Sequence, residues 1–185
     1  MEHKGFFSKT LKEITKRLKS YSLSNFDFLD IDPNVKITLS DDLKHTRFAD
    51  ELVNSQGIGI LLWQFQKNLK DGHWLGIIRN GNEMEVFDPY GTDFKSINKH
   101  LFIKDGENPL TLIRLIKQSG YVPVFNSKKL QAKVSGDNSC GRWVALRLAF
   151  RNHKLPQFHS ILTQISKSHH IKPLDIAVIS TIDKK

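Results

Sequence analysis

A β-hairpin signal at residues 73–89 constrains the fold more than any other feature of the sequence. Two runs with the pattern of β-strands flank Asn80-Gly81, and this dipeptide favours a type I′ turn because both central residues of that turn need positive φ. If these two residues form the loop, His73 lies directly opposite Asp88 on one face of the hairpin. The same register pairs apolar side chains on that face: Leu75 with Val86, and Ile77 with Met84.

The pairing of His73 with Asp88 has two interpretations. A carboxylate beside an imidazole orients the ring and stabilises its protonated form, which a catalytic base requires. The pair is equally compatible with a structural ion pair, because the chain has 8 histidines and 19 acidic residues and such pairs also perturb pKa values. A three-residue loop that includes Asn82 would shift the register and weaken the pairing. The hairpin therefore makes His73 a candidate base and leaves both interpretations open.

Cys140 is the single cysteine of the chain, and it follows a polar run at 135–139. A helical pattern begins there, so Cys140 is predicted at a helix N-terminus, where the helix dipole and free backbone N–H groups favour a thiolate. The same N–H groups can stabilise an oxyanion, and Gly141 would let a substrate backbone approach closely. A lone cysteine is also commonly a small buried hydrophobe. Cys140 is therefore a candidate nucleophile. Because the chain has one cysteine, an intrachain disulfide and a thiolate metal cluster are excluded, and a reducing compartment fits best.

The chain is basic, with 28 Lys and Arg against 19 Asp and Glu and a net charge of +9. This excess indicates a polyanionic partner, or simply a basic surface. Residues 8–21 have the pattern of a basic amphipathic helix, for which packing on the domain is preferred over membrane or nucleic-acid contact. Seven basic residues around the candidate site are either phosphate contacts or a solvated face: Lys128, Lys129, Lys133, Arg142, Arg147, Arg151 and Lys154.

The remaining pattern predicts one α+β domain over residues 1–185, with 1–21 as its basic N-terminal helix. The longest apolar run, at 58–63, is too short to span a membrane, and the N-terminus has no apolar core of a signal peptide. Strands are expected at 35–39, 57–65 and 121–125, the last an edge or bulged strand because of Pro123. Helices are expected at about 40–53, 109–118, 140–152 and 174–182.

Four stretches together resemble the adenain-like cysteine proteases, a group that includes SUMO-specific proteases and proteases of large DNA viruses and virophages. They occur in the family order of His, acid, Gln and Cys: Gly72-His73-Trp74-Leu75, Val86-Phe87-Asp88-Pro89-Tyr90-Gly91, Leu130-Gln131 and Ser139-Cys140-Gly141-Arg142-Trp143. The resemblance implies a papain-like-superfamily fold of the adenain type, in which helices flank a central mixed sheet and the nucleophile begins a helix.

The resemblance also implies a role for each matching residue. Cys140 would be the nucleophile, His73 the general base, Asp88 its orienter and Gln131 the oxyanion donor, with Trp74 packed near the imidazole. Gln131 precedes Cys140 by nine positions, a slightly longer interval than is usual in the family. Gln118 is the other glutamine between Asp88 and Cys140, and it is rejected because it lies at the end of a predicted helix.

The activity implied is that of a cysteine endopeptidase, a viral maturation protease that processes capsid or core precursors at small-residue, Gly-rich sites. We expect no required cofactor and no metal, with double-stranded DNA as a candidate stimulator and partner. A monomer without membrane contact is expected, in the virion and the host-cell cytoplasm if the chain is viral and in the cytoplasm otherwise. Two alternatives stay open: an isopeptidase that removes ubiquitin-like modifiers, and a non-catalytic basic DNA-binding core protein.

Overall fold

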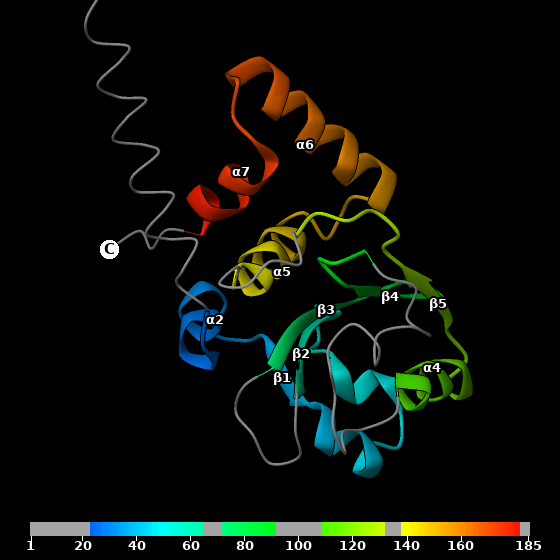
Figure 1. The fold of residues 1–185 in the computed structure, drawn as a ribbon. Helices are drawn as coiled ribbons and strands as arrows, with labels where there is room; N and C mark the ends of the chain where they lie inside the picture. The colour runs from blue at the N-terminus through cyan, green and yellow to red at the C-terminus, as the bar shows by residue number, and fades with distance from the viewer. Residues whose placement is uncertain (1–22, 65–71, 92–108, 132–137, 182–185) are drawn as a thin grey trace, which may run out of the picture.

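A computed structural model describes residues 23–64, 72–91, 109–131 and 138–181 (Figure 1). Within them, five strands form one mixed sheet in the order β1-β2-β3-β4-β5. The outer pairs, β1 with β2 and β4 with β5, are parallel, and the central pairs are antiparallel. The strands are β1 (Lys36–Leu39), β2 (Ile58–Gln64), β3 (Gly72–Asn80), β4 (Glu83–Phe87) and β5 (Val122–Phe125). The α+β class is confirmed, and of the two forms expected for the strand that contains Pro123, β5 takes the edge position.

Two apolar cores lie on opposite faces of this sheet. Side chains of β3 alternate between them, so that Trp74 belongs to one core and Leu75 to the other. The Trp74 face is covered by α2 (Asn25–Ile31), α5 (Cys140–Ala149), α6 (Leu155–His169) and α7 (Pro173–Ser180), and the Leu75 face by α4 (Pro109–Gln118) with the 3-10 helices η1 (Ser40–His45) and η2 (Ala49–Leu52) (Figure 1). None of the helices in the described part of the chain is long and apolar enough to cross a membrane.

The expected helix at 40–53 is wrong, because this segment forms η1 and η2 instead. Ser40, expected as an N-cap, is buried, and its Oγ accepts a hydrogen bond from the backbone N–H of Gln64 at 3.0 Å. Glu51 Oε1 accepts hydrogen bonds from the N–H groups of two residues that precede η2, at 3.0 and 3.1 Å. These side-chain bonds to the backbone replace the bonds of a continuous helix.

Two helices were not expected from the sequence, although each has a recognisable start. At α2, Ser24 and Asp27 form a capping box. At α6, Gln157 Oε1 accepts a hydrogen bond from the N–H of Lys154 at 3.0 Å. The other expected helices are present as α4, α5 and α7, while the one expected at 8–21 lies outside the described residues.

The loop of the β3–β4 hairpin differs from the prediction by one residue. Asn80 pairs with Glu83, so the loop consists of Gly81 and Asn82. Gly81 has a φ of 59°, which suits the first central position of a type II′ turn. The partner of every β3 residue is thereby shifted by two positions. Because strand side chains alternate with a period of two, the shift leaves each side chain on its predicted face.

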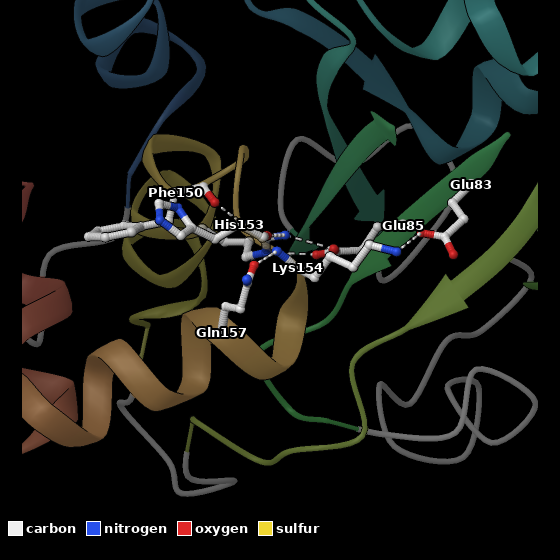
Figure 2. A network of polar contacts seen from close by, with 7 residues as sticks. Glu83, Glu85, Phe150, His153, Lys154 and Gln157 are labelled. Atoms are coloured by element: carbon white, nitrogen blue, oxygen red, sulfur yellow. Dashed lines mark hydrogen bonds and ion pairs between the residues drawn. The ribbon is translucent and has the colours of Figure 1, made fainter. Parts of the chain in front are cut away.

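Buried Arg147 ties α5 to β4. Its Nε and Nη2 donate to the two carboxylate oxygens of Glu85 at 2.8 Å each, and its guanidinium also donates to the carbonyls of Phe150 and His153 at 2.6 and 2.8 Å. Figure 2 shows Glu85 together with the chain around Phe150 and His153. Since α5 begins at Cys140, this interaction sets the position of the helix that carries the candidate nucleophile.

This burial corrects two of the predicted phosphate contacts. Arg147 is 1% exposed, and its guanidinium is paired with the Glu85 carboxylate. Arg142 is also 1% exposed and donates a hydrogen bond to Thr181 Oγ1 at 2.8 Å. Both guanidinium groups therefore stabilise the fold and are not available to bind phosphate. Arg151 is half-buried, and Lys133 lies outside the described residues. The predicted contacts that are exposed are Lys128, Lys129 and Lys154.

Replacing Arg147 by Met is expected to lower the free energy of unfolding by about 3–5 kcal/mol, because it leaves the Glu85 carboxylate buried without its counter-charge. Urea denaturation measures this loss. The matched control is Lys154→Met, which removes an exposed lysine 3.6 Å from Glu83 and should cost less than about 1 kcal/mol. Equal stability of the two variants would contradict the assignment of Arg147 as a buried anchor.

Candidate active site

His73 and Asp88 meet at one end of the hairpin. Nε2 of His73 lies 2.8 Å from Oδ1 of Asp88, and both residues are 2% exposed. The predicted direct opposition is wrong, because the β3–β4 pairing ends at Gly76 with Phe87, and Asp88 begins the turn that follows β4. His73 lies in β3, three residues before Gly76, and its side chain reaches the Asp88 carboxylate in this turn. The structure therefore brings the two side chains together through a different register.

Asp88 is held in place by a tight turn that follows β4. Its Oδ1 also accepts a hydrogen bond from the N–H of Tyr90 at 2.8 Å, and its carbonyl accepts one from the N–H of Gly91 at 2.8 Å. Gly91 has a φ of 60°, a conformation that favours glycine. This turn fixes the carboxylate with one oxygen directed at the imidazole.

Cys140 is the first residue of α5 and is 7% exposed, so the predicted helix start is confirmed at this residue. Burial lowers the pKa of His73, but hydrogen bonding and charge interaction with Asp88, and then with Cys140, raise it to about 9. Because Nε2 faces Asp88, Nδ1 is the ring nitrogen that remains for Cys140. The imidazole thus connects a carboxylate to the cysteine, and its surroundings favour the protonated ring.

Gln131 lies against the turn that holds Asp88. The N–H groups of Leu130 and Gln131 both donate to the carbonyl of Pro89 at 2.9 Å, and Gln131 is 1% exposed. Buried Asn126 joins the same two segments, since its Nδ2 donates to the carbonyl of Asp88 at 2.8 Å. Gln118, in contrast, is exposed at the end of α4. Of the two glutamines considered, Gln131 is the one whose backbone is bonded to the turn that holds Asp88.

Close packing at the start of α5 requires a glycine at position 141. A Cβ added there would lie 2.9 Å from Cβ of Leu23 and 3.3 Å from the rings of Phe28 and Trp74, so protein atoms already fill the space. Trp74 donates from Nε1 to the carbonyl of Leu23 at 2.9 Å and meets Phe28 edge-on at 5.0 Å. Gly141 and Trp74 therefore pack the start of α5 against α2.

Tyr90 is the aromatic residue whose ring lies on the imidazole of His73. Its ring is stacked on that of His73, with centroids 4.4 Å apart and an angle of 10° between the planes. Sequence reasoning assigned no role to Tyr90. The strand pattern could not have identified it, because Tyr90 lies in the turn after β4, beyond the last β3–β4 pair of Gly76 with Phe87.

The raised pKa of His73 makes the stability of the fold depend on pH. Folded His73 has a pKa of about 9 against 6.5 for an ordinary histidine, so its contribution to stability is complete below pH 6.5 and is lost as the pH rises to about 9. The urea concentration at the midpoint of unfolding should fall in the wild type as the pH rises from 6 to 9.5. In His73→Gln protein it should change less. The same pH dependence in both proteins would contradict this interaction.

The chain is similar in sequence to a virophage protein. The chain is 28% identical over 177 residues to the uncharacterized protein V9 of Sputnik virophage, a match that covers 90% of this chain and 99% of the relative. No family model matches the chain. The similarity extends over nearly the whole of both proteins, and it indicates that the chain has a viral, virophage-like origin.

Proposed function

We propose that this protein is a cysteine endopeptidase of the adenain-like type. The observation that carries the proposal is the position of His73, which is hydrogen-bonded to Asp88 at 2.8 Å and interacts with Cys140 at the start of α5. A nucleophile, a base and an orienter in this order form the arrangement that nucleophilic catalysis requires. The near-complete burial of all three residues strengthens the interactions between them.

The proposed reaction has two stages, acylation of Cys140 and hydrolysis of the acyl group. The Cys140 thiolate attacks the carbonyl carbon of the substrate, and the resulting oxyanion accepts hydrogen bonds from the Cys140 N–H and the Gln131 amide. Protonated His73 gives its proton to the leaving amine as the C–N bond breaks, which leaves a thioester on Cys140. A water molecule, deprotonated by His73, then hydrolyses the thioester and releases the acid product.

The preferred substrates are capsid or core precursors of a virus, cleaved at small-residue, Gly-rich sites. Cys140 is only 7% exposed, and such limited access favours an extended chain with small side chains next to the scissile bond. The virophage relative supports a role in a viral life cycle. Cleavage rates for peptides from candidate precursors and for ubiquitin-like fusion proteins distinguish an endopeptidase of this kind from an isopeptidase.

Labelling with a thiol-reactive probe tests the proposal directly. A catalytic Cys140 should react rapidly at neutral pH, whereas an inert buried cysteine should not. Slow labelling together with tight binding of double-stranded DNA would instead favour the non-catalytic DNA-binding alternative, for which Lys128, Lys129 and Lys154 are the exposed candidates. Such binding should weaken steeply with salt.

Replacing Gln131 by Ala is expected to lower kcat about 100- to 1000-fold with little change in KM, because the loss of one oxyanion donor destabilises the transition state alone. Steady-state cleavage of a precursor peptide measures both constants. Gln118→Ala is the matched control, since Gln118 is exposed on α4, and its kcat should stay within about twofold of the wild type. Similar kcat values for the two variants would remove Gln131 from the oxyanion site.

A further inference from the structure

A pocket of about 230 Å³ lies between α2, β2 and α5, and Figure 1 shows α2 next to α5. This α2–α5 pocket has mostly apolar walls, which include Phe28 and Ile31 of α2, Ile60 of β2 and Leu148 of α5. Its volume is below the roughly 300 Å³ or more that is typical of small-molecule sites. The pocket therefore suits apolar side chains of a polypeptide better than a small ligand.

The surface of α2 beside this pocket is both apolar and acidic. Ile31 is 45% exposed and Leu29 is 38% exposed. Arg151 also lines the pocket, but its Nη2 donates a hydrogen bond to Gln56 Oε1 at 3.2 Å. Residues 24–34 contain no lysine or arginine and three aspartates: Asp27, Asp30 and Asp32. Exposed apolar side chains beside negative charge favour an amphipathic partner whose polar residues are basic.

The chain itself supplies a segment of this kind immediately before α2. Residues 8–21 contain five lysines and arginines and one acidic residue, so their charge is opposite to that of the α2 segment. Leu11, Ile14 and Leu18 recur at the spacing of one helix face. Apolar pattern and charge therefore both match this segment to the α2–α5 pocket and the surface around it.

The point at which this segment joins the described structure places it at the head of α2. Leu23 is 5% exposed, and its carbonyl accepts a hydrogen bond from Nε1 of Trp74 at 2.9 Å. A connection over residues 22–24 has the length of the loops that join antiparallel helices. Because each helix rises about 1.5 Å per residue, a helix that folds back along α2 brings Ile14 level with Ile31.

We propose that residues 8–21 form a helix that docks antiparallel to α2 and inserts its apolar face into the α2–α5 pocket. The docked helix supports α2 where α2 packs on the start of α5. Phe28 lines the pocket, meets Trp74 edge-on at 5.0 Å, and lies 3.3 Å from a Cβ built at Gly141. The proposal stands on these contacts and charges and does not require the peptidase function.

Disulfide formation in the full-length protein tests the docking directly. In Cys140→Ala protein, Ile14→Cys paired with Ile31→Cys should form a disulfide under mild oxidation, because docking brings the two Cα atoms within the roughly 4.4–6.8 Å that the bond requires. Lys16→Cys paired with Ile31→Cys is the matched control, since Lys16 lies on the opposite face of the expected helix. The control pair should react at least about tenfold more slowly.

Equal rates for the two pairs would overturn the proposal, because an undocked segment would bring both cysteines to Ile31→Cys equally often. Non-reducing gels of diluted protein distinguish the occupants. A disulfide within one chain supports docking of the chain's own segment. A disulfide between two chains would assign the pocket to a second copy and would overturn docking within the chain.

Thermal unfolding gives a second test, in protein that retains Cys140. Ile14→Ser should lower Tm by about 4–8 °C, since it removes a buried apolar side chain, and Lys16→Ser should change Tm by less than about 1 °C. Ile14→Ser combined with Ile31→Ser should lower Tm by less than the sum of the two single changes, because both remove the same contact. An unchanged Tm in Ile14→Ser, or additive losses, would contradict the docking.

Discussion

Cys140→Ala protein is expected to lose cleavage of a precursor peptide, with kcat lower by about 10⁵- to 10⁶-fold, because no other group of the site can form the thioester. The loss should occur in a folded protein. The substitution removes one sulfur atom from a residue that is 7% exposed, and the first turn of α5 is still closed by the Trp143 N–H on the Ser139 carbonyl.

Mass spectrometry of long incubations measures residual cleavage by this variant, and thermal unfolding followed by circular dichroism checks the fold. The melting temperature should lie within a few degrees of the wild type, since small changes at a nearly buried site typically cost about 1 kcal/mol. Retained cleavage by folded Cys140→Ala protein would contradict the assignment of Cys140 as the nucleophile of a cysteine peptidase. A melting temperature far below the wild type would show instead that Cys140 acts mainly as a core residue.

His73→Ala should damage cleavage as much as Cys140→Ala, and the double variant should be no slower than either single variant. Residues that act as one catalytic unit lose their effect together, so their separate losses of about 10⁵-fold or more do not add. Asp88→Asn should be milder and leave measurable activity, because an orienter tunes the base while the base itself moves the proton. Values of kcat/KM for the four variants measure this order.

His169→Ala is the matched control, because His169 is exposed at the end of α6 and its loss should leave cleavage unchanged. Labelling of Cys140 adds a readout that does not depend on turnover. Without His73 the thiolate loses its counter-ion, so the rate of alkylation at neutral pH should fall. If His73→Ala protein were alkylated and cleaved the peptide at the same rates as the wild type, His73 and Asp88 would form only a structural ion pair.

The features that sequence reasoning predicted well depend on short stretches of chain. The start of α5 at Cys140, the span of α4 and the buried run of β2 were all expected, because caps, prolines and apolar runs act within a few residues. The contact between His73 and Asp88 was expected for a similar reason. The hairpin brings the end of β4 close to His73 in β3 even though the expected register was wrong by two residues.

Features that depend on partners distant in the sequence were missed. Ser40 hydrogen-bonds to Gln64 in β2 and does not cap a helix that follows it. Arg147 is paired with Glu85, which is 62 residues away in the sequence. Local propensity contains no information about such partners, and tertiary contacts routinely override it. A basic residue therefore looks the same in the sequence whether it is exposed to a phosphate or buried against a carboxylate.

By itself, the sequence determined the kinds of groups at the candidate site and the local elements that carry them, namely a hairpin for His73 and Asp88 and a helix start for Cys140. Tertiary structure alone decided which atoms meet. It placed Tyr90 on the imidazole and filled the space beside Gly141 with Leu23. The physical reason is that spacing along a chain specifies the direction of a side chain, whereas its contacts depend on the packing of segments that the sequence does not bring together.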